Sequence, residues 1–326
     1  MSNKAIGALA KEVGDDWKEH AYYEDVERFM PDAWKNLILP VIGGCDFTTT
    51  VDLAAGHGRN TEFLLPLART LHIVDINKEN IEFCRRRFKG RDSKIRYVVN
   101  DGSSLSALRG DSVTLVYCFD AMVHFDSDVV RNYLREFFRI LEPGSHAFIH
   151  HSNYTGNPCG KWMDNPNIRN FMSKELFAHY AHKEGLTIVS QKVIEWGGHP
   201  ELDCLSLLRK PNPPQRIGGS YTRRDGMLLV LAGAHESAKF TLARPGTVTL
   251  EAHAHAWCGR LVVKQEGRVL ATFEVNEEQP QSKPCVFEAE AGEVSLHAED
   301  RGDGRSEAWV KNIDIEWRKA SAAPQA

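Results

Sequence analysis

Two clusters of polar side chains stand where two apolar runs of the sequence end, a position from which they could act on a substrate. Asp120 and His124 follow the first run, and His150 and His151 close the second. Histidine is the usual general base for removing the proton of a neutral hydroxyl. Neighbouring residues of a strand point to opposite faces, so His150 and His151 cannot both enter one pocket. The sequence predicts a histidine base and favours His151, which is nearer the following loop.

For several other residues near the ends of these runs the sequence leaves two interpretations open. His124 is a second candidate base, or a histidine at a helix start that packs against the pocket wall. Asp120 either meets the acceptor and orients a base, or caps a helix. Beyond the histidine pair, Asn153 and Tyr154 suit the recognition of hydroxyl groups, as in a sugar. Trp162, in the long loop that follows, either stacks on a sugar face or seals the site from water.

A glycine turn earlier in the chain is typical of a nucleotide site. Residues 51–61, VDLAAGHGRNT, predict a buried strand, a tight turn at Gly56 and Gly58, and a helix start. Asn60 or the threonine after it can cap this helix, whose N–H groups face the bound molecule. Asp75 ends the next apolar run about 20 residues later, the spacing at which a carboxylate receives ribose hydroxyls.

This turn differs from one that binds a dinucleotide. A nicotinamide-binding turn has a third small residue at position 61, where this chain carries threonine. Asp52, four residues before Gly56, would repel a pyrophosphate but suits a cationic or amine-bearing ligand. The pattern therefore favours a positively charged nucleoside over a dinucleotide.

The order of the motifs resembles that of the class I S-adenosylmethionine-dependent methyltransferases, of the small-molecule and sugar O-methyltransferase type. The likeness covers roughly residues 15–210 and rests on five motifs, each at a strand boundary. These are the acid and Gly-x-Gly of residues 52–58, Asp75 after the second strand, Asp101-Gly102 after the third, the acidic turn and fourth strand at 111–118, and the LEPGS run at 141–145.

The resemblance implies S-adenosyl-L-methionine as cofactor and an enzyme that transfers its methyl group. The residues it assigns to the cofactor lie in the glycine turn and at the strand ends: Asp52, Ala54, Gly56, Gly58, Arg59, Asn60, Asp75, Ile76, Asp101, Gly102 and Phe119. Trp17 or Tyr23, in an aromatic helical segment, closes over the methionine end of the cofactor. Core packing of an amphipathic helix is the alternative for both aromatic residues.

Alternating apolar runs and helical patterns predict a Rossmann-like, doubly wound α/β fold with a seven-stranded sheet. Its last two strands, at 186–196 and 202–210, match the antiparallel hairpin at the edge of the family's sheet. Helices are expected at 15–41, 60–69, 77–89, 128–141 and 173–184. We assign residues 1–210 to the methyltransferase domain, with 1–47 as an N-terminal helical cap.

A second domain follows the proline-rich linker at 211–217. Residues 218–318 alternate in the manner of β-strands, and about eight short strands predict a β-sandwich of jelly-roll type. This domain resembles no family that we recognise. It is either a scaffold or homodimer contact, or a carbohydrate-binding module, and residues 319–326 form a tail.

Composition excludes several classes of function. The net charge of −4 gives no general attraction to nucleic acid. Residues 119–126 also lack the Asn/Asp-Pro-Pro-aromatic signature that the family uses on nucleic-acid bases. The seven cysteines are scattered without a Cys-x-x-Cys pair, and no apolar run has membrane-spanning length. We expect a cytoplasmic protein with free thiols and no membrane partner.

The predicted reaction is methyl transfer to a hydroxyl of a sugar, glycan or glycosylated small molecule. A carboxylate, phenol or amine of a natural product is the second hypothesis. A cofactor-binding protein without turnover, whose β-sandwich binds carbohydrate, is the third. No metal is expected, because histidines outnumber acids at the strand ends and Mg²⁺ sites gather several carboxylates. The pair His253 and His255 lacks further ligands nearby in the sequence and is interpreted as a surface pair.

Overall fold

The computed structural model describes residues 3–17, 22–212, 216–233, 237–302 and 304–317. The chain forms two compact units, Met1–Pro211 and Asn212–Ala326, which are described separately. The predicted tail at 319–326 and part of the predicted linker lie outside the described residues.

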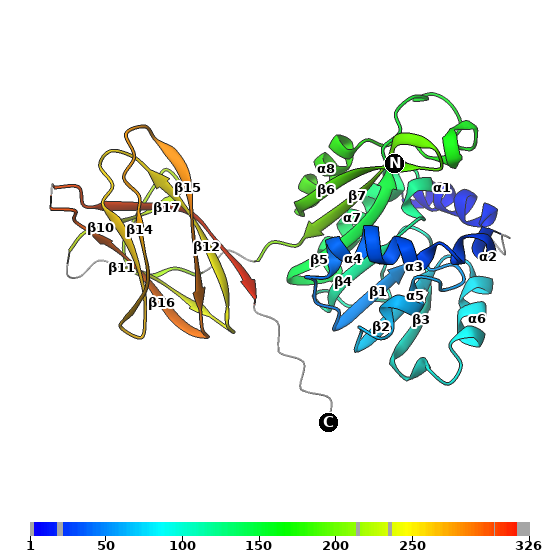
Figure 1. The fold of residues 1–326 in the computed structure, drawn as a ribbon, viewed down its shortest axis with the longest axis horizontal. Helices are drawn as coiled ribbons and strands as arrows, with labels where there is room; N and C mark the ends of the chain where they lie inside the picture. The colour runs from blue at the N-terminus through cyan, green and yellow to red at the C-terminus, as the bar shows by residue number, and fades with distance from the viewer. Residues whose placement is uncertain (1–2, 18–21, 213–215, 234–236, 303, 318–326) are drawn as a thin grey trace. The chain divides into compact units, whose positions relative to one another are not determined.

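The first unit is built on a seven-stranded sheet with the strand order β3-β2-β1-β4-β5-β7-β6 (Figure 1). Strands β1 to β5 run parallel, and β7 is antiparallel to both β5 and β6. This arrangement confirms the predicted sheet and its closing hairpin. The strands are β1 (Thr49–Leu53), β2 (Thr70–Asp75), β3 (Ile95–Val99), β4 (Val113–Cys118), β5 (Leu141–Ser152), β6 (Thr187–Trp196) and β7 (His199–Arg209).

Helices cover both faces of this sheet, because apolar side chains project from each face. One buried core joins the sheet to α1, α7 and α8, and a second joins it to the helices from α3 to α6. The helices are α1 (Asn3–Asp16), α2 (Tyr22–Glu27), α3 (Met30–Ala33), η1 (Trp34–Ile38), α4 (Leu39–Ile42), α5 (Thr61–Leu64), α6 (Lys78–Arg87), α7 (Ser127–Ile140) and α8 (Lys174–Lys183). Four short 3-10 turns complete the unit: η2 (Asp92–Lys94), η3 (Met122–His124), η4 (Trp162–Asp164) and η5 (Pro166–Ile168).

The region expected to be helical at 15–41 is helical in several pieces. Helical structure begins earlier, at Asn3, and the segment is divided into several short pieces. Pro31 and Pro40 stand in the first turns of α3 and α4. A proline fits the first turn of a helix but lacks the N–H that would continue an earlier one. Pro31 thus lies in the first turn of α3, and at Pro40 the helical backbone continues from the π-helical segment η1 into α4.

The second unit is a β-sandwich of two five-stranded antiparallel sheets, ordered β15-β12-β17-β10-β9 and β14-β13-β16-β11-β8. A single apolar core draws side chains from both sheets. Its strands are β8 (Gly218–Ser220), β9 (Thr222–Arg224), β10 (Met227–Leu231), β11 (Ser237–Leu242), β12 (Gly246–Ala254), β13 (Arg260–Gln265), β14 (Arg268–Glu274), β15 (Gln281–Ala289), β16 (Gly292–Glu299) and β17 (Glu307–Trp317). The two strands beyond the predicted eight are short, and β8 and β9 have no apolar alternation that the sequence could reveal.

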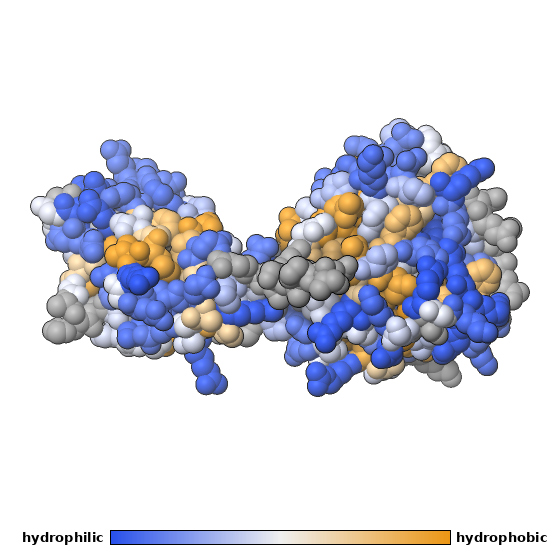
Figure 2. Space-filling model, turned by 60° about the horizontal axis from the view of Figure 1, so that its bottom comes forward, coloured by the Kyte–Doolittle hydropathy of each residue, from blue (hydrophilic) through white to orange (hydrophobic). Residues whose placement is uncertain are grey.

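The face of the protein in Figure 2 is mostly hydrophilic, with hydrophobic patches on each unit. In the sandwich, Val269 and Leu270 of β14 and Val286 of β15 are exposed. The predicted dimer contact stays a prediction. Across the described residues, every helix is too short or too polar to cross a membrane.

Candidate active site

A cavity of about 850 Å³ opens at the carboxyl ends of the parallel strands, where ligands of open α/β sheets bind. Helix α1, the turn after β1 and the start of α7 also contribute to its walls. Eleven of the residues predicted for the site line it: Trp17, Tyr23, Ala54, Arg59, Asn60, Asp75, Ile76, Gly102, Phe119, Asp120 and His124.

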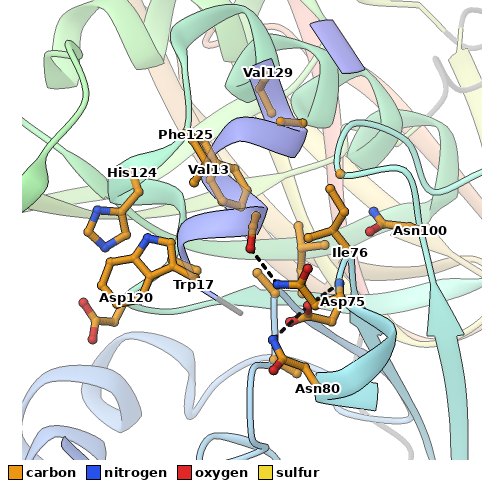
Figure 3. A pocket seen from close by; sticks show the side chains of 18 of the residues that line it. Val13, Trp17, Asp75, Ile76, Asn80, Asn100, Asp120, His124, Phe125 and Val129 are labelled. Carbon is orange, nitrogen blue, oxygen red and sulfur yellow. Dashed lines mark hydrogen bonds between the residues drawn. The ribbon is translucent and has the colours of Figure 1, made fainter. Parts of the chain in front are cut away.

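The Asp75 carboxylate accepts several hydrogen bonds at one end of this cavity (Figure 3). Its carboxylate accepts hydrogen bonds from the backbone N–H groups of Gly56 at 2.9 Å and Asn77 at 2.8 Å. The side-chain amide of Asn80 donates a third at 3.2 Å. Burial raises the pKa of Asp75 above its usual range, and these hydrogen bonds oppose that rise. The carboxylate thus fixes the glycine turn and the strand end that would receive a nucleoside.

Whether a nucleoside fits here can be judged from two buried amide oxygens. Asn80 Oδ1 and Asn100 Oδ1 belong to cavity-lining residues, and neither accepts a hydrogen bond from any described residue. A buried acceptor without a donor is unfavourable, so a bound ligand that supplies hydroxyl or amino hydrogens would satisfy both. The ribose and adenine of S-adenosylmethionine carry such donors. The chain therefore fits this cofactor, which supplies a methyl group on an electrophilic sulfonium.

Helix α1 covers the cavity through close contacts at two glycines. A Cβ at Gly14 would lie 2.7 Å from Ile76 Cγ2, and one at Gly102 would lie 2.9 Å from Ala10 Cβ. The side chain of Asn77 also donates a hydrogen bond of 2.8 Å to the Gly14 carbonyl. A larger residue at either glycine would push α1 away from the strand ends.

Both aromatic residues between which the sequence left a choice line the cavity. The Tyr23 hydroxyl donates to the Trp17 carbonyl at 2.8 Å, which ties the two together. The Tyr23 ring lies directly over Gly56, where any Cβ would collide with it. Trp17 packs its ring 4.6 Å from that of His124 (Figure 3).

Ala54, in the glycine turn, has the left-handed backbone conformation, with φ of 55°. An L-residue pays roughly 1–2 kcal/mol for this conformation, whereas glycine adopts it freely. We expect Ala54→Gly to raise the free energy of unfolding by about 0.5–1 kcal/mol after the greater entropy of glycine in the unfolded chain is subtracted. Urea unfolding measures this. The neighbouring variant Ala55→Gly is the control and should lower stability, because Ala55 is buried and has no positive φ. Equal losses from both variants would contradict the prediction.

His124 is the one predicted base that lines the cavity. Its Nδ1–H donates a hydrogen bond of 2.7 Å to the carbonyl of Ile168, which can only accept. The ring therefore carries its proton on Nδ1, and no described residue hydrogen-bonds Nε2. Burial, followed by the charge of Arg169, lowers the pKa of His124 to about 4. The histidine is thus neutral at ordinary pH, with the lone pair of Nε2 left to accept a proton.

His151, which the sequence favoured, does not fit the role of base. Its ring is fully buried and stacks on Phe177 at 3.8 Å between ring centres. Nδ1–H donates to the Ser152 carbonyl, and Nε2 accepts from the Ser206 hydroxyl, both at 2.8 Å. Burial lowers the pKa of His151 to about 3. Both nitrogens are occupied and the ring lies outside the cavity lining, so we assign it a structural role.

His150 points to the opposite face of β5, as strand geometry predicts, and also lies outside the cavity lining. Its Nδ1 accepts the backbone N–H of Asp120 at 3.1 Å, and its Nε2–H donates to Asp203 at 3.0 Å. The ring lies between Phe119 and Trp196, 4.8 Å from each. His150 therefore supports the loop that carries Asp120.

A buried charge network borders the cavity on this side. Arg59 pairs with Asp120 at 2.5 Å, and Arg169 pairs with Asp203 at 2.7 Å. Burial would raise the pKa of Asp120, but the positive charges of Arg59 and Arg169 outweigh it and lower that pKa below its usual range. Asp120 thus remains a carboxylate at the cavity wall. No motif in the sequence indicates Arg169 or Asp203, which lie in a loop and in strand β7.

Four residues predicted to touch the cofactor lie outside the cavity lining. Asp52 lies below the turn and accepts a hydrogen bond from the Thr61 hydroxyl at 2.5 Å, and burial raises its pKa to about 7. Gly56 and Gly58 have positive φ, but their open sides are filled by the Tyr23 and Phe88 rings.

Asp101 is the fourth of these residues, and it closes its own turn. Its carboxylate accepts the backbone N–H groups of Ser103 at 2.9 Å and Ser104 at 2.6 Å. The adjacent Asn100, which the sequence analysis did not select, lines the cavity in its place.

The predicted acceptor-binding residues also lie outside the lining of this cavity. Asn153 donates to the Glu201 carbonyl at 2.9 Å and accepts from the Lys174 N–H at 2.9 Å, so it joins β7 to the start of α8. Tyr154 pairs by a backbone bridge with Phe171. The Trp162 ring is 6.1 Å from that of His124 and is half-buried. Within the described ranges, no three His, Cys, Asp or Glu residues are grouped to hold a metal ion.

The strand order and the capped cavity at the strand ends are those of the class I methyltransferase fold. Residues 50–144 match the model of a family described as a methyltransferase domain. This match confirms the predicted class: the first unit is an S-adenosylmethionine-dependent methyltransferase, and S-adenosyl-L-methionine is its cofactor. The sandwich matches no recognised family, and no curated protein matches the chain.

Solved structures share the fold at low identity. A chain of the complex between the Haloferax volcanii Trm112 methyltransferase activator and a methyltransferase is 18% identical, with 64% of this chain and 98% of that chain covered and a TM-score of 0.46. Geranyl diphosphate C-methyltransferase from Streptomyces coelicolor A3(2) is 13% identical, covering 59% and 85%, with a TM-score of 0.46. A protein assigned as a sarcosine dimethylglycine methyltransferase from Galdieria sulphuraria is 14% identical, covering 56% and 86%, with a TM-score of 0.47. These likenesses carry no argument about the acceptor.

Proposed function

We propose that this protein methylates a hydroxyl group of a sugar or sugar-bearing small molecule, with His124 as the general base. The observation that carries the proposal is the hydrogen bond from His124 Nδ1–H to the Ile168 carbonyl, which leaves Nε2 for the acceptor. A neutral hydroxyl needs its proton removed as its oxygen is methylated, whereas an ionised carboxylate acceptor needs no such base. A neutral histidine held in one tautomer at the cavity wall serves that need.

The groups around His124 also suit a polar acceptor. Trp17 offers an apolar ring beside the imidazole, and Arg59 and Asp120 line the cavity with polar atoms. A sugar combines apolar ring faces with hydroxyls, so it matches such a mixed wall. The acceptor hydroxyl would donate to Nε2, and its proton would then move to that nitrogen. The carboxylates of Asp120 and Asp203 would stabilise the resulting imidazolium, since both favour its charged form.

The low pKa of His124 gives a pH dependence with a definite sign. The base must be neutral to accept a proton, so activity is retained above its pKa and lost as the pH falls through about 4. We expect kcat/KM at pH 5.5 to stay within about twofold of its value at pH 7.5, whereas a histidine with the ordinary pKa near 6.5 would lose about tenfold. Initial rates of S-adenosylhomocysteine release across this range measure it. An acid limb with its midpoint near 6.5 would contradict the assigned environment of His124.

A screen of methyl acceptors tests the proposed substrate class. The purified protein is incubated with S-adenosylmethionine and panels of sugars and glycosides, phenols, carboxylates and amines, and S-adenosylhomocysteine release is followed. We expect turnover with hydroxyl acceptors that carry sugar rings. Turnover confined to amines or carboxylates would overturn the proposal, because neither carries the hydroxyl that the proposal names as the acceptor.

A further inference from the structure

The loop that faces His124 contains an unusual backbone. Asn167 and Ile168 both have positive φ, 47° and 58°, one after the other. Asparagine tolerates this left-handed conformation, but a β-branched residue such as isoleucine strongly disfavours it. Such a conformation persists only where the surroundings impose it, and it often marks a functional site. Here it occurs at the residue whose carbonyl accepts the His124 Nδ1–H bond.

Arg169 connects this loop to the neighbouring strand β7. Its guanidinium is buried and donates two parallel hydrogen bonds to Asp203, Nε at 2.9 Å and Nη2 at 2.7 Å. The remaining guanidinium nitrogen, Nη1, donates to the Asn167 carbonyl at 2.8 Å. The guanidinium also lies over the Trp196 ring, 5.6 Å from the ring centre. One rigid, planar group thus joins β7 to the first of the two left-handed residues.

The same short loop, residues 165–170, also forms hydrogen bonds with the segment that carries His124. The Asn170 N–H donates to the Val123 carbonyl at 2.9 Å, and the Asn170 side chain donates to the His124 carbonyl at 3.2 Å. The Asn165 side chain closes the loop by donating to the Arg169 carbonyl at 2.8 Å. The His124 backbone and its ring are therefore held by one loop, and Arg169 anchors that loop to the sheet.

We propose that Arg169 is a positioning residue that fixes the tautomer of His124. By holding the Asn167 carbonyl and Asp203 together, it keeps Ile168 in the left-handed conformation that presents a carbonyl to Nδ1. Nδ1 then keeps the proton, and Nε2 keeps the lone pair on the cavity side. The inference rests on the proposed function for its purpose, but the tautomer can be observed without any acceptor.

The test is the tautomer of His124 in the full-length protein with S-adenosylhomocysteine, read from ¹⁵N resonances of histidine-labelled samples. His124→Asn assigns the signals by their disappearance. The wild-type protein should show the Nδ1–H tautomer alone. Arg169→Lys keeps the positive charge but loses the planar guanidinium with its parallel hydrogen bonds. We therefore expect the Nδ1–H tautomer to be no longer the major signal, with unchanged affinity for S-adenosylhomocysteine. Arg131→Lys is the matched control, because Arg131 pairs with Glu184 at 2.8 Å away from the cavity lining.

A rescue distinguishes positioning from general support of the fold. Glycine adopts the left-handed conformation freely, so adding Ile168→Gly to Arg169→Lys should restore part of the Nδ1–H signal. The proposal is overturned if Arg169→Lys keeps the wild-type tautomer, or if it loses ligand affinity and thermal stability together. Should Arg169→Lys not fold, Asp203→Asn decides the matter by the same two criteria. Turnover that survives in His124→Ala would instead overturn the proposed base and leave the tautomer result standing.

Discussion

Replacing His124 with alanine should lower kcat/KM for a hydroxyl acceptor by roughly 10²–10⁴-fold, the range that a positioned general base supplies. The imidazole is the predicted base that lines the cavity, and its Nε2 is the nitrogen left to receive the proton. Affinity for S-adenosylhomocysteine should change little, because Asp75 and the buried amides lie at the other end of the cavity (Figure 3). Initial rates and calorimetric binding measure the two quantities.

Two variants separate loss of the base from loss of structure. His124→Asn keeps a short side-chain donor for the Ile168 carbonyl but has no basic nitrogen, so it should lose as much activity with a smaller loss of stability. His179→Ala removes an exposed histidine of α8 and should have wild-type rates. A phenol whose hydroxyl ionises readily should be affected least by His124→Ala. Equal losses for every acceptor, or wild-type turnover, would show that His124 does not act as a base.

The contact between Asp75 and the glycine turn could be predicted because its signals are local. Gly56 needs a positive φ for the turn, and Asp75 stands at the end of an apolar strand at the expected spacing. Such features depend on a few consecutive residues, and their backbone conformation follows from residue type. The cavity is lined by Asn100 and not by the predicted Asp101 next to it, which shows the limit of this reasoning. Which side chain enters the cavity depends on where the chain leaves β3, and Asp101 is drawn into its own turn.

The acceptor end could not be predicted in the same way. The roles of His150 and His151 depend on what packs against them, and those partners lie 53 and 55 residues away in the sequence at Asp203 and Ser206. The pairing of β5 with β7 brings these residues together, and a shift of one residue would exchange the two faces. Alternation in the sandwich likewise predicted β-strands, but it does not specify a ligand.

Asp75→Ala should weaken S-adenosylhomocysteine binding by about 100-fold or more, since hydrogen bonds to a charged group contribute about 1.5–3 kcal/mol each. The carboxylate lines the cavity and organises three donors, at Gly56, Asn77 and Asn80. Its removal leaves these donors buried without an acceptor and frees the glycine turn to move. Calorimetric titration measures the affinity. The thermal shift gives a second readout, because ligand at 100 times Kd should stabilise the wild-type protein by about 2.7 kcal/mol.

The control for this variant is Asp15→Ala. Asp15 forms an exposed ion pair with Lys11 on α1, at 2.9 Å, and such pairs contribute little to stability. It should bind S-adenosylhomocysteine as the wild type does. Asp75→Asn keeps one oxygen for the backbone donors, since an amide accepts at one oxygen only. Its affinity for S-adenosylhomocysteine should lie between that of Asp75→Ala and that of the wild type. Wild-type affinity in Asp75→Ala would mean that the ligand does not approach this strand end. The assignment of the cavity would then have to be abandoned, because the Asn80 amide, whose oxygen is unsatisfied, donates to the same carboxylate.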